Sequence, residues 1–187
     1  MNQDIKKALD VLRSGGVILY PTDTIWGLGC DASNTEAVKR IYEIKKREDS
    51  KSMLVLIDNP ARLEMYVEDV PEIAWDLVEQ STTPLTVIYP KARNLAKNLI
   101  AEDGSIGIRL VDEKFCNQLI SRFQKPIVST SANISGEKSA QNFDEIPQEI
   151  INAVDYVVSY RQDDFSPVKA SSIIKLSAGG LFEIIRA

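Results

Sequence analysis

The sequence contains no histidine. This absence excludes histidine-based catalytic triads, zinc sites with histidine ligands and imidazole proton shuttles. Cysteine is scarce as well: Cys30 and Cys116 are too few for a disulfide framework and indicate reduced thiols. No apolar run approaches the roughly 18 residues of a membrane span, and residues 1–4 do not begin a signal peptide. The sequence therefore predicts a cytoplasmic protein without a membrane segment.

Basic residues are in the minority over the whole chain but not in one segment. The chain has 22 Lys and Arg against 27 Asp and Glu, a net charge of −5, which weighs against nucleic-acid binding through bulk positive charge. Residues 39–51 reverse the sign with six cations and three anions. The six cations are Lys39, Arg40, Lys45, Lys46, Arg47 and Lys51. Such a segment is typical of a solvated helix face or of an anion-binding edge, and both interpretations stay open.

Length and composition are those of one globular domain, because 187 residues with 44% hydrophobic and 26% charged side chains fit neither disorder nor a coiled coil. Apolar spacing from Ile5 to Leu12 predicts a helix that ends at Gly15. A capping box from Ser33 to Glu36 predicts a second helix, which runs to Ile44. Further helices are expected to begin at Asn59-Pro60 and at Val70-Pro71, with proline at the first helical position, and one more spans residues 114–123.

Strands are predicted at residues 17–20, 53–57, 85–89, 106–110, 126–130, 156–159, 172–176 and 181–185. Helices and strands alternate through the first 130 residues, which predicts an α/β sheet. The last strands are expected to be antiparallel, because no helix is predicted between them. The polar residues 136–142 predict a mobile surface loop.

Nucleotide-binding patterns are weak or absent. Residues 27–32 satisfy G-x-G-x-x-A, but residues 21–26 separate them from the preceding strand, and a dinucleotide-binding turn must follow its strand directly. We therefore interpret this match as accidental. No G-x-x-x-x-G-K-[ST] pattern occurs, which excludes an ATP site of the P-loop type.

Hydroxyl side chains gather where two predicted strands end. Residues 22–24 are Thr-Asp-Thr and follow the first strand, and residues 129–133 are Ser-Thr-Ser-Ala-Asn. The ends of strands are where open α/β sheets bind ligands, although such residues can also form turns that satisfy their own backbone. Two such clusters and a cationic helix end favour a polar pocket.

Arg109 lies within an otherwise apolar predicted strand. Strand alternation directs its side chain to the face of Gly107, away from Ile106 and Ile108. A buried guanidinium needs an anionic partner. The partner is either an Asp or Glu of this chain or the carboxylate of a ligand, and the sequence leaves both open.

Several motifs occur in an order that characterises one protein family. YPTDTIWGLGCDA fills residues 20–32, Lys45 and Arg47 form K-x-R, and Ser131 and Asn133 form S-x-N. Residues 84–86, Arg109, residues 171–174 and residues 185–186 follow in the same order. This ordered set, spread over residues 1–187, resembles the YrdC/Sua5 family, the L-threonylcarbamoyladenylate synthases.

The resemblance implies a single YrdC-like α/β domain over residues 1–187, with a twisted mixed sheet and flanking helices around a concave cationic cavity. It implies the short form of the family, without an additional carboxy-terminal domain. The implied enzyme is a nucleotidyltransferase that joins L-threonine, bicarbonate or CO2 and ATP into threonylcarbamoyl-AMP and releases pyrophosphate. Mg²⁺ would accompany the ATP, and no protein metal site is expected. A tRNA-modifying threonylcarbamoyl transferase complex would then use the product to form threonylcarbamoyladenosine.

The resemblance also assigns roles to nine residues. Catalytic and nucleotide-binding roles go to Lys45, Arg47, Ser131 and Asn133. Ser172 and Arg186 are assigned to the nucleotide, and Thr24, Arg109 and Ser171 to threonine. Lysine suits a polyphosphate as a point charge and arginine as a fork of donors.

The chain departs from the family pattern at a few positions. Trp26 replaces a tyrosine, and Ser81-Thr82-Thr83 replaces Trp/Tyr-Pro-Gly. Glu48 and Ser52 replace prolines. Two alternatives stay open: a module that binds double-stranded RNA or tRNA without turnover, and a paralogue that acts on another carbamoyl or acyl substrate.

Overall fold

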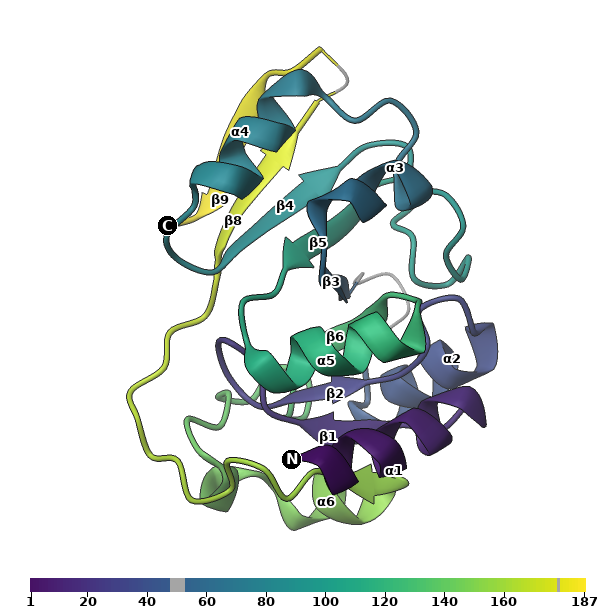
Figure 1. Cartoon of the computed structure of the whole chain (residues 1–187), viewed down its shortest axis with the longest axis vertical. Helices are drawn as coiled ribbons and strands as arrows, with labels where there is room; N and C mark the ends of the chain where they lie inside the picture. The colour runs from purple at the N-terminus through teal and green to yellow at the C-terminus, as the bar shows by residue number, and fades with distance from the viewer. Residues whose placement is uncertain (48–52, 178) are drawn as a thin grey trace.

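The computed structural model describes residues 1–47, 53–177 and 179–187, and within these ranges nine strands form one mixed sheet with helices against it (Figure 1). The strands are β1 (Ile18–Tyr20), β2 (Gly27–Gly29), β3 (Leu54–Ile57), β4 (Leu85–Tyr89), β5 (Ile106–Leu110), β6 (Ile127–Ser131), β7 (Tyr156–Val157), β8 (Ser172–Leu176) and β9 (Phe182–Arg186). The α-helices are α1 (Asn2–Arg13), α2 (Thr35–Ile44), α3 (Leu63–Tyr66), α4 (Glu72–Gln80), α5 (Lys114–Phe123) and α6 (Gln148–Ala153). Two short 3-10 helices are η1 (Pro60–Arg62) and η2 (Phe143–Glu145).

The strand order is β7-β1-β2-β6-β3-β5-β4-β8-β9. β1 is parallel to β7, β3 to β5 and β4 to β8, whereas the other neighbours are antiparallel. The expectation that the last strands are antiparallel is therefore correct only for β8 and β9. It fails for β7 and β8 because the chain crosses the molecule before each of them, through α6 and through a long segment over residues 158–171.

The helices lie in two groups. α1 and α5 contact each other in front of β1, β2 and β6, and α3 and α4 lie with β4, β5, β8 and β9 in the other half of the molecule (Figure 1). Ile5, Ala8, Leu9 and Leu12 are buried on one face of α1, as their spacing predicts. Gly15 follows this helix with a φ of 80°, which explains why glycine ends it.

Two predicted helix starts need correction. The side chain of Asn34, not that of Ser33, caps α2, because Asn34 Oδ1 accepts hydrogen bonds from the backbone of Glu36 and Ala37 at 3.1 Å. Ser33 instead donates its hydroxyl to Asp31 Oδ1 at 2.6 Å. Pro60 is the first residue of its helix, as expected, whereas Pro71 is the residue before α4.

Strand β2 was not predicted, because glycines at both of its ends hide any alternation. Gly29 is required there by contact: a Cβ atom would lie 2.6 Å from Tyr20 Cε1 and 2.9 Å from the carbonyl oxygen of Val128. The G-x-G pattern is thus part of a tightly packed strand and not a turn between strand and helix. This confirms that its match to a dinucleotide-binding motif is accidental. Helix α6 was also missed, because its six residues are too few to show a helical period.

No helix in the described part of the chain is long and apolar enough to cross a membrane.

Candidate functional site

A cavity of about 230 Å³ collects polar side chains from distant parts of the chain. Six of the nine predicted site residues line it: Thr24, Arg47, Arg109, Ser131, Ser171 and Arg186. Trp26, Gly27, Ser129, Thr130 and Ser139 also line it, with Met53, Leu54 and Ile173 as apolar neighbours. Among the described lining residues three are arginines and none is a carboxylate. The cavity therefore favours an anionic ligand that can accept many hydrogen bonds.

A tight turn in the loop between β1 and β2 orients the Thr24 hydroxyl. Thr22 Oγ1 donates its one proton to the carbonyl oxygen of Ile25 at 2.8 Å and accepts the Thr24 N–H at 3.1 Å. The Thr24 hydroxyl lies 3.0 Å from the same oxygen and must be the donor of that pair. The lone pairs of Thr24 Oγ1 are therefore left to accept a hydrogen bond, for example from a ligand amine.

Arg109 makes the ion pair that its sequence position predicts. Its Nη2 lies 3.1 Å from Asp23 Oδ1, and the two side chains are only 4% and 6% exposed. Burial raises the pKa of Asp23, and the positive charge of Arg109 opposes this rise. The Nε atom of Arg109 is buried and has no hydrogen-bond partner among the described residues. The guanidinium thus combines an internal ion-pair partner with a buried donor that has no partner among the described residues, in a residue that lines the cavity.

Lys45 does not line the cavity, and it is not part of a solvated helix face. Its side chain is buried, and its Nζ donates to the carbonyl oxygens of Ser131 and, at 2.6 Å, of Asn133. Burial, with a smaller contribution from the nearby charge of Arg47, lowers the pKa of Lys45 to about 8. Lys46 is exposed and pairs with Glu149 at 3.0 Å, whereas Arg47 is half-buried and lines the cavity. The rest of the cationic segment, residues 48–51, lies outside the described residues.

Asn133 is buried beside the cavity and does not line it. Its Nδ2 donates to the carbonyl oxygens of Ile134 at 2.9 Å and of Glu137 at 2.8 Å, so the side chain closes the loop that follows β6. Its Oδ1 is buried and has no partner among the described residues. A buried acceptor left unsatisfied in this way is costly.

The remaining predicted residues lie at the β4, β8 and β9 side. Ser171 is buried, its hydroxyl lies 2.8 Å from Thr86 Oγ1, and its carbonyl oxygen accepts from Arg186 Nε at 2.8 Å. Ser172 lies in β8, donates its backbone N–H to Pro84, and is not among the residues that line the cavity. Sequence reasoning assigned no role to Thr86. This residue belongs to the motif at residues 84–86, and its hydroxyl is within hydrogen-bond distance of the Ser171 hydroxyl.

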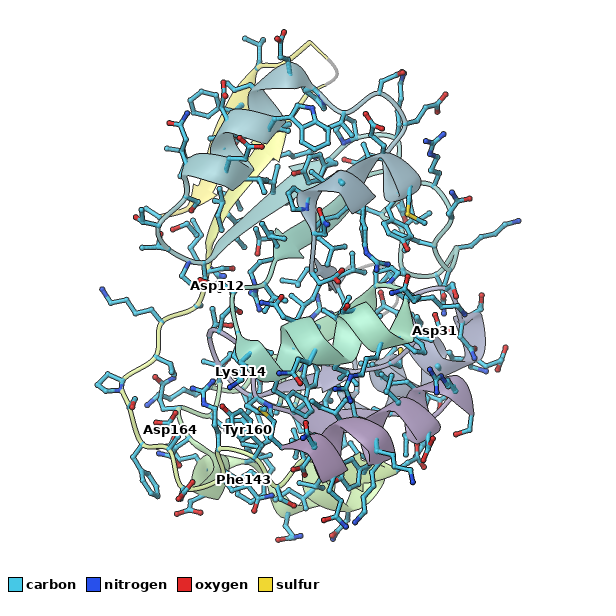
Figure 2. All side chains as sticks on the ribbon, viewed as in Figure 1. Asp31, Asp112, Lys114, Phe143, Tyr160 and Asp164 are labelled. Carbon is cyan, nitrogen blue, oxygen red and sulfur yellow. The ribbon has the colours of Figure 1, made fainter. Side chains whose placement is uncertain are left out.

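One aromatic ring lines the cavity, and a second ring packs against it. Trp26 lines the cavity, is 6% exposed, and its ring centroid lies 5.0 Å from that of Phe143, which is labelled in Figure 2 and does not itself line the cavity. Phe143 follows the polar residues 136–142, of which Ser139 lines the cavity. Sequence reasoning did not assign Phe143, since nothing in its local sequence connects it to residue 26.

A second cavity, of about 510 Å³, adjoins the first and shares Met53, Leu54 and Ile173 with it. Its lining is mixed: Ile88 and Ala101 add to the shared apolar residues, whereas Glu102 and an ion pair between Asp103 and Lys175, at 2.7 Å, are charged. The altered residues 81–83 line neither of these cavities. They line a separate cavity of about 710 Å³ together with Asp112 and Glu113.

The fold and the site define an α/β protein whose mixed sheet carries a polar cavity lined by hydroxyls and arginines. A family model for the Sua5, YciO and YrdC proteins, described as "Telomere recombination", matches residues 10–187. The chain therefore belongs to the Sua5/YciO/YrdC family.

Relatives of this chain include proteins from bacteria and from man. The threonylcarbamoyl-AMP synthase of Pseudoalteromonas translucida is 34% identical over 157 residues, which cover 82% of this chain and 84% of that protein. The threonylcarbamoyl-AMP synthase of Homo sapiens is 33% identical and covers 97% of this chain and 66% of that protein.

Solved structures confirm the mixed α/β fold. Sua5 of P. abyssi complexed with L-threonine superposes with a TM-score of 0.82 and 26% identity, covering 92% of this chain. The chain spans about half the length of that protein, with 50% covered. YciO of E. coli has a TM-score of 0.85 at 23% identity and covers all of this chain and 89% of that one. At this identity the likeness to YciO concerns the fold alone.

Proposed function

We propose that this chain is a nucleotidyltransferase that makes threonylcarbamoyl-AMP and pyrophosphate from L-threonine, bicarbonate or CO2, and ATP. One observation carries the proposal: every predicted motif except residues 84–86 contributes at least one residue to the lining of the 230 Å³ cavity. The names of the relatives and the threonine complex of P. abyssi Sua5 support it.

The threonine end of the proposed site is formed by Thr24, Arg109 and Ser171. The free lone pairs of Thr24 Oγ1 suit the amino group of threonine, and the Arg109 guanidinium suits its carboxylate. The Ser171 hydroxyl, held by Thr86, is available to the polar side chain of the amino acid.

The nucleotide end is formed by Arg47, Ser131 and Arg186, with Lys45 and Asn133 holding the loop that carries Ser131. A cavity of 230 Å³ is small for threonine and ATP together, since sites for small ligands occupy about 300–1,000 Å³. The adjoining cavity of 510 Å³ supplies the missing space, and the apolar part of its lining, which includes Met53, Leu54 and Ile88, suits the nucleoside.

In the proposed reaction the amine of threonine adds to CO2, forms a carbamate and loses a proton. A carbamate oxygen then bonds to the α-phosphorus of ATP while the bond from that phosphorus to the bridging oxygen breaks, and pyrophosphate leaves. The arginines stabilise charge that spreads over the phosphate oxygens, and the cavity fixes the two reactants in line. No step needs a covalent nucleophile or an imidazole.

Mg²⁺ enters the proposal as part of the Mg–ATP substrate. No group of three or more Cys, Asp or Glu side chains suited to a metal occurs in the described residues. The described lining of the 230 Å³ cavity offers no carboxylate, and of the two that line the adjoining cavity, Glu102 and Asp103, the latter is paired with Lys175. Mg²⁺ commonly binds through substrate phosphates with few protein ligands. The residues present therefore suit an ion that arrives with the nucleotide.

The product is an activated acyl group, and we propose that a tRNA-modifying threonylcarbamoyl transferase complex in the cytoplasm consumes it to form threonylcarbamoyladenosine in tRNA. Direct contact of this chain with tRNA or double-stranded RNA is not needed for this step.

The proposal is tested by incubating the chain with Mg–ATP, threonine and bicarbonate. We expect pyrophosphate release and a new acyl-adenylate by mass spectrometry, and both should stop when any one substrate is omitted. Pyrophosphate release at an equal rate without threonine would contradict the proposal. Binding of RNA without any turnover would support the RNA-binding alternative instead.

A further inference from the structure

Among the described residues, Asp23 is the ion-pair partner of the Arg109 side chain, and it comes from the loop that also carries Thr24. Both side chains are more than nine-tenths buried. Arg109 lines the 230 Å³ cavity, whereas Asp23 lines the separate cavity of about 710 Å³. Asp23 therefore contacts the guanidinium without being part of the lining of the site cavity.

The position of the Arg109 backbone is fixed from both sides. β5 pairs with β3 and with β4, which places Arg109 opposite Leu56 and Thr86. Gly107 lies two residues earlier on the same face of the strand. A Cβ atom added there would lie 3.3 Å from Leu54 Cβ, which is a tight contact. The strand is thus rigid, and the long arginine side chain is the part whose direction must still be set.

Asp23 is itself held in place. Its loop is closed by the bonds of Thr22 to Ile25 and Thr24. Its carboxylate accepts a hydrogen bond from the backbone of Asp112, which lies in the segment that joins β5 to α5, close to Lys114 (Figure 2). Asp23 Oδ1 forms the ion pair with Arg109 and has no hydrogen-bond partner among the described residues. A carboxylate held by two backbone segments can still direct a guanidinium, because the attraction between opposite charges is strong at this distance in a buried site.

We propose that Asp23 is a positioning residue: it directs the Arg109 guanidinium so that the remaining donors, including Nε, meet the carboxylate of the amino-acid substrate beside Thr24. This inference rests on the proposed function, because it names the amino acid as the ligand. Asp23 acts only through Arg109 and touches neither substrate.

The test measures binding of L-threonine by calorimetry for the wild-type chain and for Asp23→Asn, Arg109→Met and the double variant. We expect Asp23→Asn to weaken threonine binding at least tenfold and to leave the affinity for Mg–ATP alone within about twofold. Because Asp23 acts through Arg109, the double variant should bind threonine no more weakly than Arg109→Met. Asp31→Asn is the control, since Asp31 is also a buried carboxylate in an ion pair, with the half-exposed Lys125 at 2.6 Å, and lines neither the site cavity nor the adjoining one.

A second variant distinguishes a positioning role of Asp23 from simple neutralisation of the Arg109 charge, and it is useful if Asp23→Asn folds poorly. Asp23→Glu keeps the negative charge but moves the carboxylate by one methylene. If Asp23 positions Arg109, this variant should bind threonine more weakly; if Asp23 only neutralises the charge of Arg109, it should bind threonine with the wild-type affinity. Wild-type or tighter threonine binding in Asp23→Asn or in Asp23→Glu, or an additive loss in the double variant, would overturn this inference alone. No threonine binding by the wild-type chain would overturn the proposed function and this inference with it.

Discussion

The buried amine of Lys45 donates hydrogen bonds to the carbonyl oxygens of Ser131 and Asn133, the two named residues of the S-x-N motif. The backbone strengthens this link, because Ser135 donates its N–H to the carbonyl oxygen of Lys45 at 2.9 Å. The two motifs are thus one structural unit, in which the end of α2 holds the loop after β6. Lys45 acts in this unit by holding Ser131 at the cavity.

The low pKa of Lys45 predicts a pH-dependent contribution to stability. Since its pKa is about 8 in the folded chain and near 10.4 when unfolded, the unfolded state binds more protons between these values. The free energy of unfolding should therefore rise with pH in this window, by up to about 1.4 kcal/mol per pH unit from this group. A neutral amine still has two N–H donors for its two carbonyls.

The measurement compares urea unfolding of the wild-type chain and of Lys45→Met from pH 7.5 to pH 10. The stability difference between them should grow with pH. The control Lys46→Met removes an exposed lysine and should give a small, constant difference. A Lys45→Met difference that is equally constant would contradict the prediction.

Arg47→Ala should lower kcat/KM for ATP roughly tenfold to more than a hundredfold, because a charge-assisted bond to phosphate contributes about 1.5–3 kcal/mol. Lys46→Ala is the matched control, since Lys46 is the neighbouring cation, exposed and paired with Glu149. It should change kcat/KM by less than about threefold. Equal effects of the two substitutions would argue for a general influence of charge and against contact of Arg47 with the nucleotide.

Ser131 and Asn133 should respond differently to alanine. Asn133→Ala removes two buried hydrogen bonds to the backbone of its loop, so we expect a loss of about 1–3 kcal/mol in unfolding free energy. Ser131→Ala should leave the melting temperature nearly unchanged and lower turnover moderately, as expected for a neutral donor in the cavity. Thermal melting and kcat/KM of both variants check this, and a fully stable Asn133→Ala would disprove the structural role.

Alanine substitutions at Gly29 and Gly27 should distinguish an effect on strand packing from an effect on the site. Gly29→Ala places a Cβ 2.6 Å from Tyr20 and should destabilise the fold by about 1–3 kcal/mol or more, with little change in KM of the folded fraction. Gly27→Ala meets its nearest atom at 3.2 Å and lines the cavity, so it should cost less stability and more activity. The reverse pattern in melting and kinetics would contradict both assignments.

Sequence patterns predicted the regular elements well where apolar side chains alternate or recur. β4, β5, β8 and α5 have the predicted bounds, and the other expected strands differ by one or two residues at their ends. Prediction failed where the local sequence shows no periodic pattern of apolar residues. β2 is held by contacts across the sheet, and the parallel pairing of β7 with β1 depends on how the chain crosses the molecule.

The sequence patterns predicted which residues form the site better than they predicted how these residues are arranged. The family motifs and the hydroxyl clusters named six residues that line one cavity. They could not show that Lys45 and Asn133 bond to the backbone, because this depends on how far each side chain is buried. They also could not choose the partner of Arg109. Asp23 and Arg109 are 86 residues apart in the sequence, and the strand order β1-β2-β6-β3-β5 brings the loop of Asp23 to the strand of Arg109.

The strand order has a consequence for biosynthesis. Ile18 lies opposite Tyr156, and the cavity uses residues from Thr24 to Arg186. Sheets with such long-range pairing fold slowly, within about milliseconds to seconds, because distant segments must meet before the contacts form. A nascent chain still lacking β8 and β9 has neither Ser171 nor Arg186 in place, so the complete cavity forms only after synthesis has passed Arg186. Ribosome-bound fragments should therefore be inactive, and substrates can stabilise only the finished fold.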